Sequence, residues 1–184
     1  LNSMSQPLTW DSRGPGGGGA IVSAAISPFN GNKYYLACDM SDMFRTYDFG
    51  RTYSIIPFTD LQVQNRSEMQ FTADSSKLFV LNKPSNGPYI PAKSYDGGLT
   101  WLSATNPCQN TASQLFSNPY DTNQVVICDR NKVYFSNNES LPSGYITIFN
   151  YPGTYGVHLG GVFCQHKDTI YVCTHDSIKY TFNG

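Results

Sequence analysis

Two aspartates occur in a short sequence pattern whose carboxylate and glycine could together stabilise a turn. Asp48 and Asp96 each occupy the third position of S/T-x-D-x-G-x-T-aromatic. A carboxylate placed there can accept hydrogen bonds from the backbone N–H groups of its own turn, and the glycine supplies a positive φ. The pattern therefore predicts a structural turn, not a catalytic one, with its aromatic residue largely buried. Its two near-complete copies contain Thr46, Asp48, Gly50 and Tyr53, and Ser94, Asp96, Gly98 and Trp101.

Other residue types with chemical potential lack the spacing of a site. His158, His166 and His175 are too scattered to form a ligand set, so we expect no metal and no cofactor. The glycine run at residues 16–19 is not followed by the Gly-Lys-Ser/Thr of a phosphate cradle. Two interpretations of it stay open, a close approach of backbone to a sugar and a plain crossing between strands.

Five cysteines include no CxxC pair with metal-site spacing. Cys38, Cys128 and Cys173 end equivalent strands, which fits either small buried side chains or disulfide partners. Cys108 and Cys164 are the two that we expect to be disulfide-bonded. An odd count leaves one thiol free or paired outside this chain.

The box turns recur along the chain at nearly even intervals, and the length of the interval indicates which secondary-structure elements lie between them. They match the Asp-box pattern and begin at residues 46, 94, 136 and 181, a period of roughly 45 residues. The third copy, at Ser136, is degenerate, and the fourth begins at Thr181. Two apolar strands rich in β-branched and aromatic residues precede each box, and no helical period competes with them. The sequence therefore predicts an all-β protein, a β-propeller with about four blades.

We expect a single propeller domain, or a portion of one, over residues 1–184. Its start, Leu8-Thr-Trp10-Asp-Ser12, is similar to the end of the second box, and its last residues begin a fourth box. Residues 7–12 are therefore predicted to be a closing outer strand. A closed four-bladed ring and part of a larger, seven-bladed propeller both fit, and the missing initiator Met suggests a processed or incomplete chain. The predicted blades cover about residues 20–58, 68–106, 112–150 and 156–184.

The first blade carries a more specific order of residues. A glycine run at residues 14–19 precedes Ser27-Pro28, and the segment Asp39-Met-Ser-Asp-Met-Phe-Arg-Thr-Tyr-Asp48 follows. Over residues 8–53 this order resembles glycoside hydrolase family 74 and related Asp-box (BNR-repeat) proteins. The resemblance implies inverting hydrolysis of β-1,4-glucans such as xyloglucan. It also implies that Asp39 is the general base, by its match to the Asp of the family's T-D-x-G-G motif.

This chain departs from the family pattern at the same place. Cys38 replaces the Thr, Ser41 and Asp42 replace the two glycines, and the family's partner acid lies on a second propeller that has no counterpart here. Inversion needs two carboxyl groups about 6.5–9.5 Å apart. Asp42 and Asp129 are other acids near strand ends but have no motif support, so a hydrogen bond from Asp39 to loop backbone remains an alternative to catalysis.

Composition favours an extracellular, secreted domain. Charged residues make up 14% of the chain and the net charge is −1, which offers no electrostatic attraction to nucleic acid or an anionic membrane. No apolar run has the length of a membrane helix, and no signal-peptide pattern is present. The sequons at Asn65 and Asn138 are glycosylation sites if the protein is a glycoprotein.

Three functions remain open. They are hydrolysis of a glycan such as a β-1,4-glucan, non-catalytic binding of a carbohydrate or protein, and a structural role in which identical subunits join head to tail by strand exchange. The expected partners are accordingly a polysaccharide and either the remainder of a propeller or neighbouring identical subunits. Loop tyrosines could stack on sugars or pack between blades; these are Tyr89, Tyr120, Tyr145, Tyr151 and Tyr155.

Overall fold

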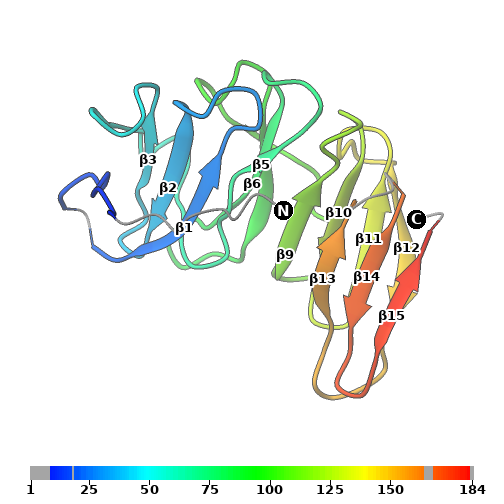
Figure 1. Cartoon of the computed structure of the whole chain (residues 1–184). Helices are drawn as coiled ribbons and strands as arrows, with labels where there is room; N and C mark the ends of the chain where they lie inside the picture. Colours follow the sequence, from blue (N-terminus) through cyan, green and yellow to red (C-terminus); the bar gives the residue numbers. More distant parts are fainter. Residues whose placement is uncertain (1–8, 18, 164–167, 183–184) are drawn as a thin grey trace, which may run out of the picture.

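The chain is all-β, and its strands form four antiparallel sheets arranged as the four blades of a β-propeller (Figure 1). The computed structural model describes residues 9–17, 19–163 and 168–182. Figure 1 shows the sheets following one another in chain order, from the blue strands of the first to the orange and red strands of the fourth. The predicted fold class is confirmed.

The first three sheets contain four strands each, in chain order, and the fourth contains three. The first sheet consists of β1 (Ile21–Ile26), β2 (Tyr34–Cys38), β3 (Met43–Thr46) and β4 (Ser54–Ile55). The second consists of β5 (Gln70–Phe71), β6 (Leu78–Asn82), β7 (Ile90–Ser94) and β8 (Leu102–Ser103). The third consists of β9 (Gln114–Ser117), β10 (Val125–Cys128), β11 (Lys132–Ser136) and β12 (Tyr145–Asn150). The fourth consists of β13 (His158–Val162), β14 (Ile170–Cys173) and β15 (Ile178–Thr181).

The second strands of the second and third blades, β6 and β10, are largely apolar because each packs against a neighbouring blade on both sides. Successive side chains of a strand point to opposite faces of the sheet. In β6, Leu78 and Val80 join the cluster shared with the first blade, whereas Phe79 and Leu81 join the cluster shared with the third. In β10, Val125 and Ile127 likewise join the cluster shared with the second blade, whereas Val126 and Cys128 join the cluster shared with the fourth. This two-sided burial explains why no polar alternation marks these strands in the sequence.

The four first strands surround one hollow. Side chains from β1, β5, β9 and β13 line a cavity of about 390 Å³, which corresponds to the propeller axis. Apolar clusters join the first blade to the second, the second to the third and the third to the fourth. Among the described residues, no apolar cluster joins the fourth blade to the first. The blades are therefore held together by three consecutive interfaces.

The hydrogen bonds predicted for the box turns are present. Asp48 Oδ1 accepts the N–H groups of Arg51 at 3.0 Å and Thr52 at 2.9 Å, and its Oδ2 accepts the Thr52 hydroxyl at 2.8 Å. Asp96 repeats this arrangement with the N–H groups of Leu99 and Thr100. These hydrogen bonds lower the pKa of both carboxyl groups to about 2. The turns are thus stabilised by ionised aspartates.

The aromatic residues of the boxes are less buried than predicted. Tyr53 and Trp101 are both half-buried, because they stand just before the outermost strand of a blade, whose outer edge is open to water. Trp101 still packs against the cluster between the first two blades. The prediction of largely buried box aromatics is therefore wrong in degree.

The disulfide prediction for Cys108 is wrong. Cys108 is a free, buried thiol in the cluster between the second and third blades, and Cys38 and Cys128 are free and buried as well. Burial is the main cause that raises the pKa of Cys108 to about 12. Cys173 is a half-buried free thiol, and Cys164 lies outside the described residues. Packing, not cross-linking, explains the repeated position of cysteine at the ends of these strands.

The predicted closing strand is not formed in this chain. Residues 7 and 8 lie outside the described residues, residues 9–12 belong to no sheet, and the Trp10 side chain is 89% exposed. A strand requires a hydrogen-bonding neighbour, and none of the four sheets supplies one to this segment. Pairing of residues 7–12 with a blade of another chain, or of a longer one, stays a prediction.

Candidate functional site

One end of the propeller gathers the loops that can form a site. In each blade the turn after the second strand lies beside the start of the first strand, since Ile21 pairs with Cys38, Gln114 with Cys128 and His158 with Cys173. We call this the hairpin end. It contains the turns at residues 39–42, 83–89, 129–131 and 174–177. The box turns lie at the opposite end, because the third strand of each blade runs away from these hairpins.

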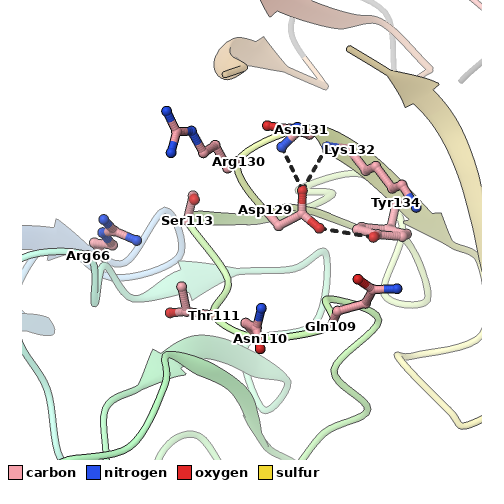
Figure 2. Close-up of a pocket in the computed structure, with 10 residues that line it drawn as sticks. All are labelled: Arg66, Gln109, Asn110, Thr111, Ser113, Asp129, Arg130, Asn131, Lys132 and Tyr134. Carbon is pink, nitrogen blue, oxygen red and sulfur yellow. Dashed lines mark hydrogen bonds between the residues drawn. The ribbon is translucent and has the colours of Figure 1, made fainter. Parts of the chain in front are cut away.

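Two neighbouring pockets open at the hairpin end. The first, of about 500 Å³, lies between loops of the second and third blades and is lined mainly by polar side chains (Figure 2). The second, of about 430 Å³, is lined by residues of all four blades. Arg66, Ser113 and Arg130 line both, so the two pockets form one continuous groove. We call it the hairpin groove.

Asp39 lies on this end, outside the hairpin groove. It is exposed directly after β2, and its Oδ1 accepts the Ala20 N–H at 2.9 Å, while its own N–H donates to the Ala20 carbonyl at 3.0 Å. Gly19 has φ of 86°, and a Cβ on it would lie 2.2 Å from Asp39 Oδ1. Part of the glycine run thus lets the chain cross close to Asp39. Asp39 is absent from the lining of both pockets.

Ser41 and Asp42, in the turn at residues 39–42, stand where the family pattern has two glycines. Ser41 has φ of 77°, the left-handed region that a side chain rarely adopts. A serine here keeps the backbone that glycine would favour, and its carbonyl accepts the Val63 N–H at 3.1 Å. The neighbouring Asp42 is half-buried. Ser41 therefore has a backbone conformation that glycine adopts more easily.

Asp129 is the equivalent of Asp39 in the third blade, since each follows the cysteine that ends the second strand. Its Oδ1 accepts the N–H groups of Asn131 and Lys132, both at 2.7 Å, and its Oδ2 accepts the Tyr134 hydroxyl at 3.0 Å (Figure 2). Burial, followed by this hydrogen bond, raises the pKa of Tyr134. Asp129 lines the hairpin groove, but its oxygens stabilise their own turn.

Cationic side chains outnumber acidic ones in the lining of the groove. Arg66 comes from the loop before β5 and Arg130 from the turn between β10 and β11, so two blades supply the guanidinium groups. Figure 2 shows them on either side of Ser113, with the Arg130 side chain directed away from Asp129. Glu68 is the other acid in the lining, and burial raises the pKa of its carboxyl group although its surface stays open to water.

Of the loop tyrosines, Tyr155 alone among the described ones combines high exposure with a place in the groove. Its ring is 74% exposed and stacks on His175, with ring centroids 4.2 Å apart and planes at 28°. Tyr89 is buried and donates its hydroxyl to Asn65 Oδ1 at 2.6 Å, and Tyr145 and Tyr151 are half-buried. Tyr120 is 61% exposed but stands in the β9–β10 turn at the opposite end.

The two sequon asparagines have separate environments. Asn65 lines the hairpin groove, whereas the Asn138 side chain accepts the Ser136 hydroxyl at 2.8 Å within the third box turn. Glycosylation at either residue stays a prediction. His158 also lines the groove, and His166 lies outside the described residues.

Sequence reasoning missed Arg66, Glu68 and Arg130, the charged residues that shape the groove. None has a role in a motif, and Arg130 lies in a different blade from Arg66 and Glu68. One signal was available for Arg130, because it follows Asp129, the repeat-equivalent of Asp39. Within the described ranges, no group of three or more His, Cys, Asp or Glu residues is placed to hold a metal ion. The same part of the chain has no helix that could cross a membrane.

Comparison with known proteins gives structural relatives only. No family model matches the chain, and no curated protein matches it by sequence. A GH74 enzyme from Niastella koreensis superposes with a TM-score of 0.62 and 21% identity, over 83% of this chain and 25% of that one. An ancestral GH74 enzyme gives a TM-score of 0.67 and 17% identity, over 97% and 25% of the two chains.

A third solved structure is an auxiliary nutrient binding protein from Bacteroides thetaiotaomicron. It superposes with a TM-score of 0.63 and 16% identity, over 88% of this chain and 38% of that one. The chain thus spans about a quarter of the length of the GH74 enzymes that it resembles. The structural likeness to GH74 propellers confirms, at the level of the fold, the resemblance read in the first blade.

Proposed function

We propose that this propeller binds a glycan chain in the hairpin groove. The observation that carries the proposal is the exposed Tyr155 ring, fixed by stacking on His175, beside Arg66 and Arg130 in one pocket. Sugar rings present apolar faces to aromatic platforms and hydroxyl groups to planar hydrogen-bonding side chains. An open groove with both features suits an extended polymer better than an enclosed small molecule. The likeness of the fold to GH74 enzymes, one of them a xyloglucanase, supports this choice.

Binding is favoured over hydrolysis by the state of the carboxylates. An inverting glycosidase needs one protonated and one ionised carboxyl group on opposite sides of the scissile bond. Asp129 uses both oxygens within its own turn, and Asp39 holds Ala20 outside the groove. Burial raises the pKa of Glu68, but the other acid in the groove lining, Asp129, uses its oxygens within its own turn. A catalytic role for Asp39 remains a separate proposal, and we also propose that the protein acts outside the cell.

The test is binding to soluble xyloglucan and mixed-linkage glucan by affinity electrophoresis and calorimetry. Tyr155→Ala removes the platform and should weaken binding at least about tenfold, since stacked aromatic contacts carry a large share of such affinities. Tyr120→Ala is the matched control, because it removes a similarly exposed ring from the opposite end. Equal loss in both variants, or no binding of any glycan by the parent protein, would refute the proposal.

A second candidate function is head-to-tail assembly of identical subunits. The sheet order gives β15 one neighbouring strand in the described chain, and Ile178 and Tyr180 on it are 68% and 62% exposed. Residues 9–12 repeat the sequence type of the second box and its outer strand, Thr100 to Ser103, and expose Trp10. We propose that this segment of one subunit adds a strand beside β15 of the next.

Light scattering tests the assembly. Trp10→Ala and a deletion of residues 1–12 should both convert a concentration-dependent assembly into single subunits, whereas Tyr120→Ala should not change its size. A monodisperse parent protein of 20.4 kDa at all concentrations would exclude strand exchange between subunits.

A further inference from the structure

Two arginines of the hairpin groove form no ion pair with a carboxylate in the part of the chain that the structure describes. Across the described residues, the structure gives one ion pair, between Lys77 and Glu139 at the box-turn end. Arg66 donates to the Ala112 carbonyl at 3.5 Å and lies over the Tyr89 ring at 5.3 Å, and Arg130 donates to the Thr154 carbonyl at 2.6 Å. Each guanidinium has five N–H donors, so most of its donors are directed to the solvent.

The acid nearest in sequence does not neutralise them. Asp129 accepts two backbone N–H groups and the Tyr134 hydroxyl, and Arg130 extends away from it (Figure 2). Lys132 lines the same pocket and adds a third positive charge. Glu68 and Asp129 are the two acids of the wall against these three positive charges, and neither forms an ion pair with the arginines in the described part of the chain. The groove is therefore locally cationic in a chain whose net charge is −1.

The loop that contains Tyr155 is hydrogen-bonded to Arg130. The Val157 N–H donates to the Arg130 carbonyl at 2.8 Å, and the Arg130 guanidinium donates back to Thr154. Gly156 makes this contact possible, since it has φ of 84° and a Cβ on it would lie 2.8 Å from the Arg130 carbonyl oxygen. The loop is thus held by hydrogen bonds at Thr154 and Val157, on both sides of Tyr155. An aromatic ring and a guanidinium group are held side by side before any ligand arrives.

We propose that the ligand of the groove is an acidic glycan, one that contains uronate residues. A uronate ring stacks on Tyr155, and the carboxylate on its C5 carbon is held by the guanidinium groups of Arg66 and Arg130. Arginine binds carboxylates through paired, charge-assisted hydrogen bonds that a neutral hydroxymethyl group cannot replace. Since the whole chain has almost no net charge, selectivity for the acid arises in this groove and not from long-range attraction. This inference rests on the proposed glycan binding.

The test compares polygalacturonate with its fully methyl-esterified form, which has the same backbone without the charge. The parent protein should bind the acid at least about tenfold more tightly, and this preference should fall as salt is raised. The double variant Arg66→Gln/Arg130→Gln should reduce the preference to about one. Arg51→Gln is the control, because Arg51 is an exposed arginine of the first box turn at the opposite end. Thermal unfolding of each variant verifies that it is folded.

The outcomes separate the two proposals. Equal binding of acid and ester, with loss in Tyr155→Ala, overturns the uronate inference and leaves glycan binding intact. Binding of no polysaccharide at all overturns both. If inorganic phosphate at constant ionic strength competes as well as galacturonate does, the groove recognises anions without a sugar, and the uronate inference is again overturned.

Discussion

Removing the Asp96 carboxylate should destabilise the second blade by an amount that the turn geometry sets. This side chain accepts the Leu99 N–H at 3.0 Å, the Thr100 N–H at 2.9 Å, the Thr100 hydroxyl at 2.6 Å and the Ser94 hydroxyl at 2.8 Å. The Thr100 side-chain and backbone hydrogen bonds are the largest causes that lower its pKa from 3.8 to about 2. Complete loss of that interaction corresponds to roughly 2.4 kcal/mol.

The measured loss should be smaller because the turn is open to water. Asp96, Leu99 and Thr100 are all exposed, so water replaces the hydrogen bonds that Asp96→Ala removes, and solvent screening weakens the charge. The Gly98 N–H also keeps its bond to the Ser94 hydroxyl at 2.8 Å. We therefore expect a loss of about 1 kcal/mol in the free energy of unfolding, and a decrease of about 2–4 °C in Tm for a chain of this size.

The pH dependence makes this prediction specific. A carboxyl group whose pKa is lowered in the folded state stabilises the fold above its unfolded pKa and loses that effect as the pH falls through the folded value. The difference between parent and Asp96→Ala should be constant above about pH 5 and should shrink as the pH falls from 3.8 toward 2. Chemical denaturation followed by tyrosine and tryptophan fluorescence at a series of pH values measures it.

Asp96→Asn is the matched control. The third blade already has asparagine at this position, where Asn138 Oδ1 accepts the Ser136 hydroxyl at 2.8 Å. The amide oxygen should retain part of the stabilisation without the pH dependence. Glycan binding should not change in either variant, because the box turns lie at the end opposite to the hairpin groove. An unchanged Tm for Asp96→Ala, or a loss that does not depend on pH, would contradict the assignment of this carboxylate.

Three further predictions concern the hairpin end and the core. If Asp39 is a general base, Asp39→Asn should reduce reducing-sugar release from xyloglucan by orders of magnitude while glycan binding survives; equal activity in both proteins, or none in either, removes the catalytic role. Gly156→Ala should lower stability by about 1–2 kcal/mol and weaken glycan binding, because its Cβ would lie 2.8 Å from the Arg130 carbonyl oxygen; unchanged Tm and affinity would refute this contact. Cys108, buried and with a pKa raised to about 12, should be alkylated at pH 8 far more slowly in the native than in the denatured protein, and fast native labelling would contradict its burial.

Local sequence was sufficient to predict the fold because its determinants repeat at short range. The carboxylate of Asp48 contacts donors three and four residues away, so its hydrogen bonds follow from the spacing alone. Runs such as residues 78–81 are apolar at every position because alternate side chains pack on different neighbouring blades. Strand content and repeat length could therefore be predicted without knowing which blade meets which.

The tertiary structure decided the degree of burial and the composition of the groove. Trp101 is half-buried because it stands just before the outermost strand of a blade, and Cys108 is a buried thiol because it packs into an apolar interface. Neither fact can be predicted from the neighbouring residues in the sequence.

Asp39 could be located from its motif, but its bond to Ala20 and its place outside the groove depend on where the chain crosses into the first strand. The groove itself unites Arg66, Arg130 and Tyr155 from loops of three different blades. Such a site forms only when the blades pack around a common axis, since the distances between its residues are set by sheet packing and not by their separation in the sequence.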